Sequence, residues 1–170
     1  EYYLSAIGFL PGELYLKINL AWLYRSLGKH QDSLDLFERV ISIDSKNTQA
    51  YYGAGLAAQE LGVSELAEEY YRDCIQLNEE YIDPLSSLGW LLYGQGRYDE
   101  ALGIFEDYYR VNDSDGWAAY GMGICLQNME EYEAALDYLL ESEPLLPNEY
   151  SALPSSFACY FYLSNDTKVD

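Results

Sequence analysis

Hydrophobic and small residues recur along this chain at the spacing of an α-helix, and the pattern returns every 34 residues. When Gly55, Gly89 and Gly123 are aligned with Ala21, one register runs from residue 14 to residue 149 without an insertion or a deletion. A fixed period of about 20 to 50 residues is typical of proteins built from stacked structural repeats. The sequence therefore predicts four copies of one structural unit.

Each unit carries two helical stripes. Positions are numbered within a unit from 1, and position 1 of the first unit is Leu14. Apolar residues at positions 4, 7, 8 and 11 share one face of a first helix, and those at 20, 24 and 27 share one face of a second helix. Glycine or alanine at position 8 faces serine or alanine at position 20, so the two backbones can approach closely. A turn is expected near position 15, which is occupied by Gly28, Gly62, Gly96 and Glu130. The pattern predicts helical hairpins and an all-α fold.

These hairpins resemble the tetratricopeptide repeat, in which glycine, aromatic and alanine positions follow at set intervals. The resemblance is carried by the segments SLGKHQDSLDLF, ELGVSELAEEYY, GQGRYDEALGIF and NMEEYEAALDYL. It implies a right-handed superhelix of helical hairpins that serves as a protein-binding scaffold. The chain departs from the family at position 32, where Ser45, Glu79 and Asp113 replace the usual proline. We expect this departure to alter the packing of consecutive repeats.

The register divides the chain into four complete repeats and a partial repeat at each end. The complete repeats are residues 14–47, 48–81, 82–115 and 116–149. Residues 1–13 are interpreted as the second helix of a preceding repeat, and residues 150–170 as the first helix of a fifth repeat or a C-terminal cap. Two interpretations stay open, because the odd helices could be caps or the chain could be a piece of a longer array. We favour the longer array.

A second stripe on the first helices, at positions 2, 5, 9 and 12, is the candidate binding surface. In the family that the chain resembles, first helices line the concave side. The stripe is mostly apolar and holds all three tryptophans, and residues 48–59, 84–95 and 116–129 contain no charged side chain. Exposed apolar surface of this kind usually marks a binding site. The predicted peptide-binding residues are Tyr15, Asn19, Trp22, Tyr52, Leu56, Ser87, Trp90, Tyr93, Trp117, Tyr120 and Ile124.

The aromatic stripe also has structural explanations. Wide side chains could fill the inside of a tightly wound superhelix or pack against a neighbouring repeat outside this sequence. They could also form a homodimer interface, so a homo-oligomer remains an open alternative. The polar residues Asn19, Gln49, Ser87 and Gln127 are candidates for hydrogen bonds to a peptide main chain if the stripe is a groove.

The charge of the chain narrows the class of partner. The formal net charge is -20, from 29 acidic and 9 basic residues, so phosphate backbones and anionic membrane surfaces would be repelled. No stretch reaches the roughly 18 consecutive apolar residues of a membrane span, and three widely spaced cysteines argue against a disulfide framework. We expect a cytoplasmic protein whose partner is a protein or peptide, with neither nucleic acid nor membrane involved.

Catalytic and metal-binding constellations were not found in the sequence. The single histidine, His30, stands where Tyr98 and Tyr132 stand in later repeats, so it is interpreted as a helix-turn residue. One histidine in a turn cannot build a Ser-His-Asp triad, a Cys-His pair or a zinc site. The prediction is a protein without catalytic residues, cofactor or metal.

Together these features predict a non-enzymatic scaffold that binds a hydrophobic or mildly basic peptide segment in an aromatic concave groove. One alternative is a chaperone of type III secretion for hydrophobic translocator proteins, because GMGICLQNMEEYEAAL is similar to the middle repeats of that family. The other alternative is a self-association or structural segment of a larger multi-repeat protein.

Overall fold

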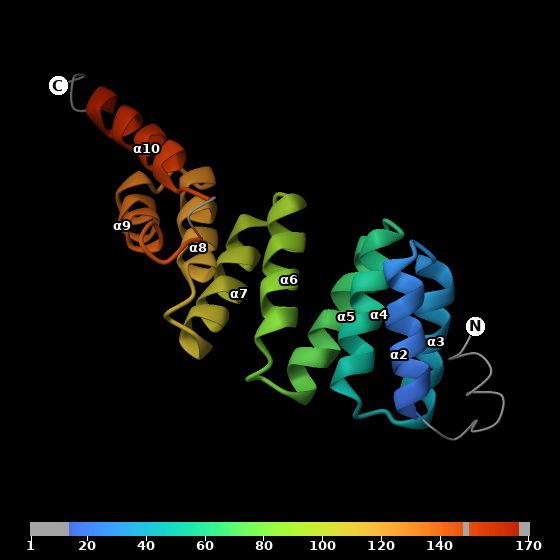
Figure 1. The fold of residues 1–170 in the computed structure, drawn as a ribbon. Helices are drawn as coiled ribbons and strands as arrows, with labels where there is room; N and C mark the ends of the chain where they lie inside the picture. Colours follow the sequence, from blue (N-terminus) through green and yellow to red (C-terminus); the bar gives the residue numbers. More distant parts are fainter. Residues whose placement is uncertain (1–13, 148–149, 167–170) are drawn as a thin grey trace. The chain divides into compact units, whose positions relative to one another are not determined.

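The computed structural model describes residues 14–147 and 150–166 of the chain (Figure 1), and these residues form helices and no strands. The predicted all-α class is confirmed, while the predicted helix over residues 1–13 lies outside the described residues. The helices in the described ranges are α2 (Leu14–Ser26), α3 (His30–Ile43), α4 (Thr48–Glu60), α5 (Ser64–Leu77), α6 (Ile82–Gly94), α7 (Tyr98–Val111), α8 (Gly116–Asn128), α9 (Tyr132–Ser142) and α10 (Leu153–Asp166).

The chain divides into two compact units, residues 1–84 and 85–170, and each is described by itself. Unit 1 contains α2 to α5 and the first turn of α6. Unit 2 contains the rest of α6 and α7 to α10.

Short left-handed turns join the two helices of each hairpin. Gly28, Gly62 and Gly96 adopt φ angles of 72°, 77° and 75°, and Glu130 adopts 66° at the equivalent place between α8 and α9. Glycine enters this region without a steric penalty because it has no Cβ, whereas any other residue is strained there. The turn chemistry therefore comes from glycine in three hairpins and from a strained glutamate in the fourth.

Side-chain caps help to start two of the first helices. The Asn47 side chain accepts a hydrogen bond from the Ala50 N–H at 3.0 Å, and Asp115 accepts one from the Trp117 N–H at 3.0 Å. Such caps satisfy backbone donors that the first turn of a helix leaves unpaired. The starts of α4 and α8 are thus set by residues just before them.

The core of unit 1 forms where α2, α3, α4 and α5 pack in sequence. The Ser33 hydroxyl of α3 donates a hydrogen bond to the Ala21 carbonyl of α2 at 2.8 Å, which shows how closely the two backbones approach. Phe37 is fully buried, and a Cβ on Gly53 would lie 2.3 Å from its ring. The core thus depends on small residues that admit an aromatic ring.

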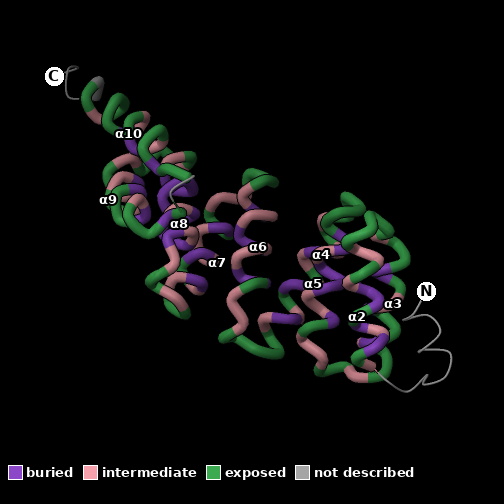
Figure 2. The backbone as a smooth tube through the Cα atoms, viewed as in Figure 1, coloured by how far each residue is buried: buried purple, intermediate pink, exposed green. Residues whose placement is uncertain are grey.

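The core of unit 2 repeats this arrangement around Phe105 of α7. A Cβ on Gly89 would lie 2.7 Å from the Phe105 ring, and a Cβ on Gly121 would lie 2.6 Å from it. The ring is therefore held between α6 and α8. Figure 2 shows α8 buried along most of its length, and the buried residues run from Gly116 to Leu126 with few interruptions.

The last helix, α10, packs against α9 through one face only. Ala152, just before the helix, and Cys159 within it are fully buried, while Phe157 and Phe161 are 70% and 64% exposed. Figure 2 shows this helix as mostly exposed. The ring of Tyr162 stacks on Tyr132 of α9 with centroids 4.7 Å apart and planes within 8°.

Candidate functional site

The aromatic surface of unit 1 consists of Trp22, Tyr52 and Tyr81. The Trp22 ring meets the buried Phe37 ring edge to face, with centroids 5.1 Å apart, and lies 6.4 Å from the Tyr52 ring. The centroid of the Tyr81 ring lies 5.5 Å from that of Tyr52. These three side chains are half-buried, so each ring keeps an accessible edge. Contacts with the core thus orient a row of aromatic edges.

One cation lies beside this row. The Arg25 guanidinium lies 5.7 Å from the centroid of the Trp22 ring and donates a hydrogen bond to Glu60 at 2.8 Å. Glu60 also lies 2.8 Å from Nδ1 of His30, the single histidine of the chain. The histidine thus belongs to a surface ion cluster at the end of the first hairpin.

The aromatic surface of unit 2 consists of Trp90, Tyr93, Trp117 and Tyr120. Trp90 lies at the centre of this surface. The centroid of its ring lies 6.0 Å from that of Tyr93, 6.1 Å from that of Trp117 and 6.2 Å from that of Tyr120. The ring of the same tryptophan also packs on Phe105, with centroids 5.1 Å apart and planes at 69°. All four members are half-buried. The structure thus brings together four of the predicted binding residues in one contiguous cluster.

The remaining predicted residues differ in accessibility. Tyr15 is 57% exposed and Asn19 is also exposed, whereas Leu56 and Ser87 are half-buried. Ile124 is only 5% exposed and belongs to the hydrophobic cluster around α8, α9 and α10. Of the predicted stripe, Ile124 therefore offers almost no surface to a ligand.

The phenols of Tyr81 and Tyr93 have pKa values raised above the ordinary value of 10.0. Burial, with a smaller contribution from Asp83, raises the pKa of Tyr81 to about 12. Burial also raises the pKa of Tyr93, whose hydroxyl oxygen accepts a hydrogen bond from the Asn128 amide at 3.2 Å. Asn128 is in turn held by the Ile124 carbonyl at 2.8 Å. These surfaces can therefore offer ring edges and neutral hydroxyl groups to a ligand.

Two aromatic neighbours of the stripe were not predicted from the sequence. Tyr81 packs on Tyr52 from the segment before α6, and Tyr150 packs on Trp117 with centroids 4.8 Å apart. Both residues lie outside the helices, where a helical period does not apply. The one signal in the sequence was a tyrosine at or just after the end of a 34-residue unit.

The titratable groups give no sign of a reactive centre within the described ranges. No group of three or more His, Cys, Asp or Glu side chains there could hold a metal ion. The thiols of Cys74 and Cys125 are fully buried, and burial raises the pKa of each to about 12. A protonated, buried thiol is a poor nucleophile. Among the residues described, moreover, no helix has the length and apolar character to traverse a bilayer.

Two plant proteins are similar to half of this chain. They are each described as a probable UDP-N-acetylglucosamine–peptide N-acetylglucosaminyltransferase SPINDLY, from Arabidopsis thaliana and Solanum lycopersicum. Each is 31% identical over 84 residues, which cover 49% of this chain. The matched segment is only 9% of the length of either plant protein.

Several solved structures share the fold over most of the chain. YrrB, described as a TPR protein with an unusual peptide-binding site, is 24% identical with a TM-score of 0.82, covering 97% of this chain and 85% of its own. MamA is 20% identical with a TM-score of 0.78, covering 82% of each chain. A MamA fragment from Desulfovibrio magneticus RS-1 is 16% identical with a TM-score of 0.76, covering 92% and 94%.

Three family models, each described as tetratricopeptide repeat, match residues 14–43, 48–81 and 92–153. They agree with the helical hairpins, with the glycine–aromatic contacts inside them and with the fold of the solved structures. Proteins of this fold are typically non-catalytic scaffolds for protein–protein interaction. The chain belongs to the tetratricopeptide-repeat family.

Proposed function

We propose that the chain is a non-enzymatic scaffold whose aromatic surfaces bind a hydrophobic or mildly basic peptide segment of a partner protein. The observation that carries the proposal is the pair Trp90 and Trp117, whose rings lie 6.1 Å apart at 82° and keep accessible edges. Tryptophans in such clusters are typical anchors of protein interfaces. An aliphatic or aromatic side chain of the partner would lie against these ring edges.

The charge around the aromatic surfaces supports a preference for mildly basic segments. The first helices that carry Tyr52, Trp90 and Trp117 have few or no charged residues, whereas the chain as a whole has a net charge of -20. A negative field attracts a cationic segment at long range, and an uncharged contact surface has no charge of its own to desolvate when the apolar side chains of that segment bind. Neutral tyrosine hydroxyl groups can bond to the peptide main chain.

The available area sets a modest affinity for each anchor. A half-exposed tryptophan that buries a further ~100 Å² on binding contributes at most ~2.5 kcal/mol before the ordering cost is subtracted. Two or three such anchors contribute at most about 5 to 7.5 kcal/mol, which corresponds to a Kd of roughly 10⁻⁴ M for two anchors and a few times 10⁻⁶ M for three before that cost. Tighter binding would require polar contacts, for which exposed Asn19 is placed on the same stripe.

The proposal is tested by selecting peptides from a random display library and measuring their affinity for variants. Selected peptides should be rich in apolar and basic residues. Each of the single variants Trp90→Leu and Trp117→Leu should bind them more weakly, by about tenfold or more. Tyr70→Leu is the matched control, because Tyr70 is a half-buried aromatic residue on α5 that belongs to neither aromatic surface. The proposal fails if both tryptophan variants are folded and bind the selected peptides with the same affinity as the unaltered chain.

A second candidate function, self-association, is favoured by the outer face of α10. Leu153, Phe157, Tyr160 and Phe161 follow a helical spacing and are 46%, 70%, 50% and 64% exposed. When one residue is inserted after residue 149, Phe157 and Phe161 align with Met122 and Leu126, which are buried in α8 at 3% and 6% exposure. A contiguous apolar helix face of this kind is typical of an interaction surface.

Light scattering across a wide range of protein concentration tests self-association. We expect a dimer that dissociates on dilution, and Phe157→Ser with Phe161→Ser should remain monomeric. If the unaltered chain has monomeric mass at every concentration, this candidate is excluded.

Location and activity are the remaining functional predictions. We propose a cytoplasmic location, because Cys74, Cys125 and Cys159 are free thiols, as is usual in reducing compartments. The transferase activity named for the SPINDLY proteins is not assigned to this chain, since the match spans 9% of their length. The type III secretion chaperone alternative stays a prediction.

A further inference from the structure

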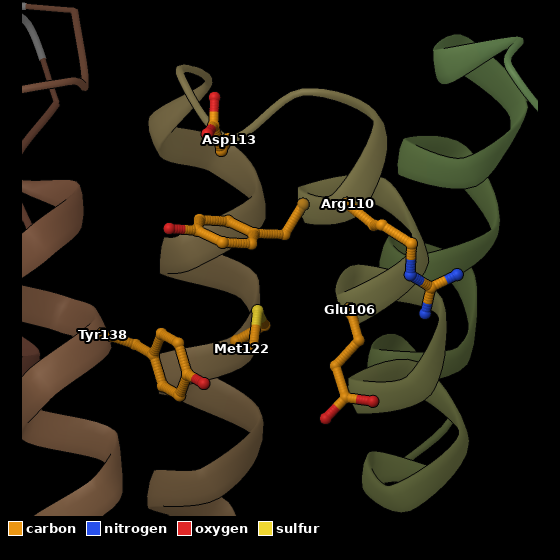
Figure 3. A pocket seen from close by; sticks show the side chains of 6 residues that line it. Glu106, Arg110, Asp113, Met122 and Tyr138 are labelled. Carbon is orange, nitrogen blue, oxygen red and sulfur yellow. The ribbon is translucent and has the colours of Figure 1, made fainter.

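Unit 2 has a surface hollow of about 480 Å³ that belongs to neither aromatic surface (Figure 3). It lies where α7, α8 and α9 meet, and Figure 3 shows Tyr138 reaching from α9 toward Met122. The residues that line it are Glu106, Tyr109, Arg110, Asp113, Met122 and Tyr138.

The hollow lies on the opposite side of α8 from the aromatic surface of unit 2. Successive residues of an α-helix are rotated by about 100°, so Met122 is about 140° from Trp117 and about 160° from Tyr120 around the helix axis. A ligand of the hollow would therefore contact a different face of the hairpin. Binding at one surface can be measured without involving the other.

The charge balance inside the hollow is negative. Arg110 is its one cation, and this guanidinium is paired with Asp107 at 2.8 Å. The Glu106 carboxylate forms no hydrogen bond or ion pair with any described part of the chain, while Asp113 accepts only a hydrogen bond from Ser114 at 3.2 Å. Figure 3 places these two carboxylates at separate ends of the hollow. A cation that enters would meet a carboxylate at either end.

The other lining residues suit the hydrocarbon part of a long cationic side chain. Met122 is only 3% exposed and lies at the base of the hollow, so the half-buried rings of Tyr109 and Tyr138 provide its accessible apolar wall. The Tyr109 hydroxyl donates a hydrogen bond to Glu141 of α9, which ties its ring in place beside the hollow. Aromatic faces attract cations, and lysine and arginine bury their methylene stems against apolar surface while their charged heads stay near polar groups.

From this geometry we propose that the hollow between α7, α8 and α9 binds a lysine or arginine side chain of a protein partner. The stem lies on the rings of Tyr109 and Tyr138, above the buried Met122, and the charged head pairs with Glu106 or Asp113. An anionic group is disfavoured, because the one cation of the hollow is already paired and the chain has a net charge of -20. The site is a second contact on the face of the hairpin away from the aromatic surface.

The two methionines of the chain allow a direct test by NMR, because Met122 lies in the hollow and Met129 lies at the end of α8. The protein is labelled with ¹³C in the methionine methyl groups, and Met129→Leu assigns the two signals. N-acetyl-arginine amide and N-acetyl-lysine amide serve as probes, with uncharged N-acetyl-citrulline amide as the control ligand. We expect the Met122 signal to shift saturably with the two cationic probes only, and the Met129 signal to stay.

Charge-removing variants identify the partners of the probe. Glu106→Gln combined with Asp113→Asn should weaken binding by about threefold to tenfold. Glu79→Gln combined with Glu80→Gln makes the same change of charge at exposed positions of unit 1 and should leave binding unaltered. Three results would each overturn the proposal: no saturable shift of Met122, an equal shift with citrulline, or equal weakening in both double variants. None depends on whether the aromatic surfaces bind a peptide.

Discussion

Trp90 and Phe105 meet edge to face, with ring centroids 5.1 Å apart and an interplanar angle of 69°. Trp22 and Phe37 in unit 1 form an almost identical pair at 5.1 Å and 73°. In each pair, one ring belongs to the buried core of a hairpin and the other belongs to the candidate binding surface. The part of each tryptophan that packs on the core phenylalanine thus stabilises the hairpin, and the part that remains exposed is accessible to a partner.

Removal of either tryptophan should therefore cost stability as well as binding. We expect Trp90→Ala to lower the free energy of unfolding by about 2–3 kcal/mol, less than for a fully buried tryptophan because one edge is already in water. Trp22→Ala should have a similar effect in unit 1. Urea unfolding followed by circular dichroism measures both losses. An unchanged midpoint for both variants would show that the contacts with Phe105 and Phe37 contribute nothing.

The glycine contacts with Phe105 predict a steric effect that can be reversed. Gly89→Ala should destabilise unit 2 by about 1–3 kcal/mol, because the new Cβ overlaps the ring and forces either the ring or the helix to move. In a chain that already carries Phe105→Leu, the same Gly89→Ala change should lower the free energy of unfolding by less than it does in the unaltered chain. A double-mutant cycle measured by urea unfolding gives this coupling.

Gly103 provides the control for this experiment. It lies inside α7, and a Cβ placed there would have no atom within 4 Å. Gly103→Ala should therefore raise the free energy of unfolding by about 0.5–1 kcal/mol through helix propensity alone. The steric interpretation is wrong if alanine has the same effect at both glycines.

The strained turn at Glu130 predicts a stabilising substitution. Glu130 has a φ of 66°, where the equivalent Gly96 has 75°. Glu130→Gly should raise the free energy of unfolding by about 1 kcal/mol, because it removes the left-handed strain of a residue with a side chain. Gly96→Ala should lower it by a similar amount, although a Cβ at that position has open space. Thermal unfolding of the two variants should shift in opposite directions, and shifts of the same sign would contradict the argument.

The buried thiols predict a loss of stability in alkaline solution. Burial raises the pKa of Cys74 and Cys125 from the ordinary value of 9.0 to about 12. Below about pH 9 both the folded and the unfolded chain keep these protons. Between about pH 9 and pH 12 only the unfolded chain loses them, so unfolding becomes more favourable, by up to about 1.4 kcal/mol per pH unit for each thiol.

Urea unfolding across this pH range tests the assignment. Cys125→Ala should reduce the slope of stability against pH, whatever its effect on stability at neutral pH. Tyr81 contributes to stability with the same sign. Burial raises its pKa to about 12 as well, so its ionisation in the unfolded chain adds to the alkaline loss of stability. A slope that is identical in Cys125→Ala would show that this thiol does not titrate as proposed.

Local spacing was sufficient to predict the helical hairpins and their turns. Gly55 at position 8 packs against Tyr71 at position 24. A Cβ added to Gly55 would lie 2.5 Å from the Tyr71 ring. The left-handed turn at Gly62 likewise follows from the residue type. Such features depend on neighbours within one hairpin, so the periodicity of the sequence contains them.

The candidate site was predicted less completely, because accessibility depends on more than one hairpin. Tyr120 and Ile124 share one predicted stripe, yet Tyr120 is half-buried and Ile124 is 5% exposed in the cluster with α9 and α10. Tyr150 packs on Trp117 from a loop, which no helical period describes. The depth of each side chain was therefore outside the reach of a helical pattern.

The sequence by itself determined the repeat, the all-α class, the turns and the stripe on which the tryptophans lie, because helical periodicity and glycine geometry are local properties. Only the tertiary structure decided that Trp90 packs on Phe105, that Ile124 is covered, and that Glu106 and Asp113 border one hollow on the other side of α8. Those relationships join residues of different helices, and their distances depend on how whole helices pack rather than on the spacing along any one of them.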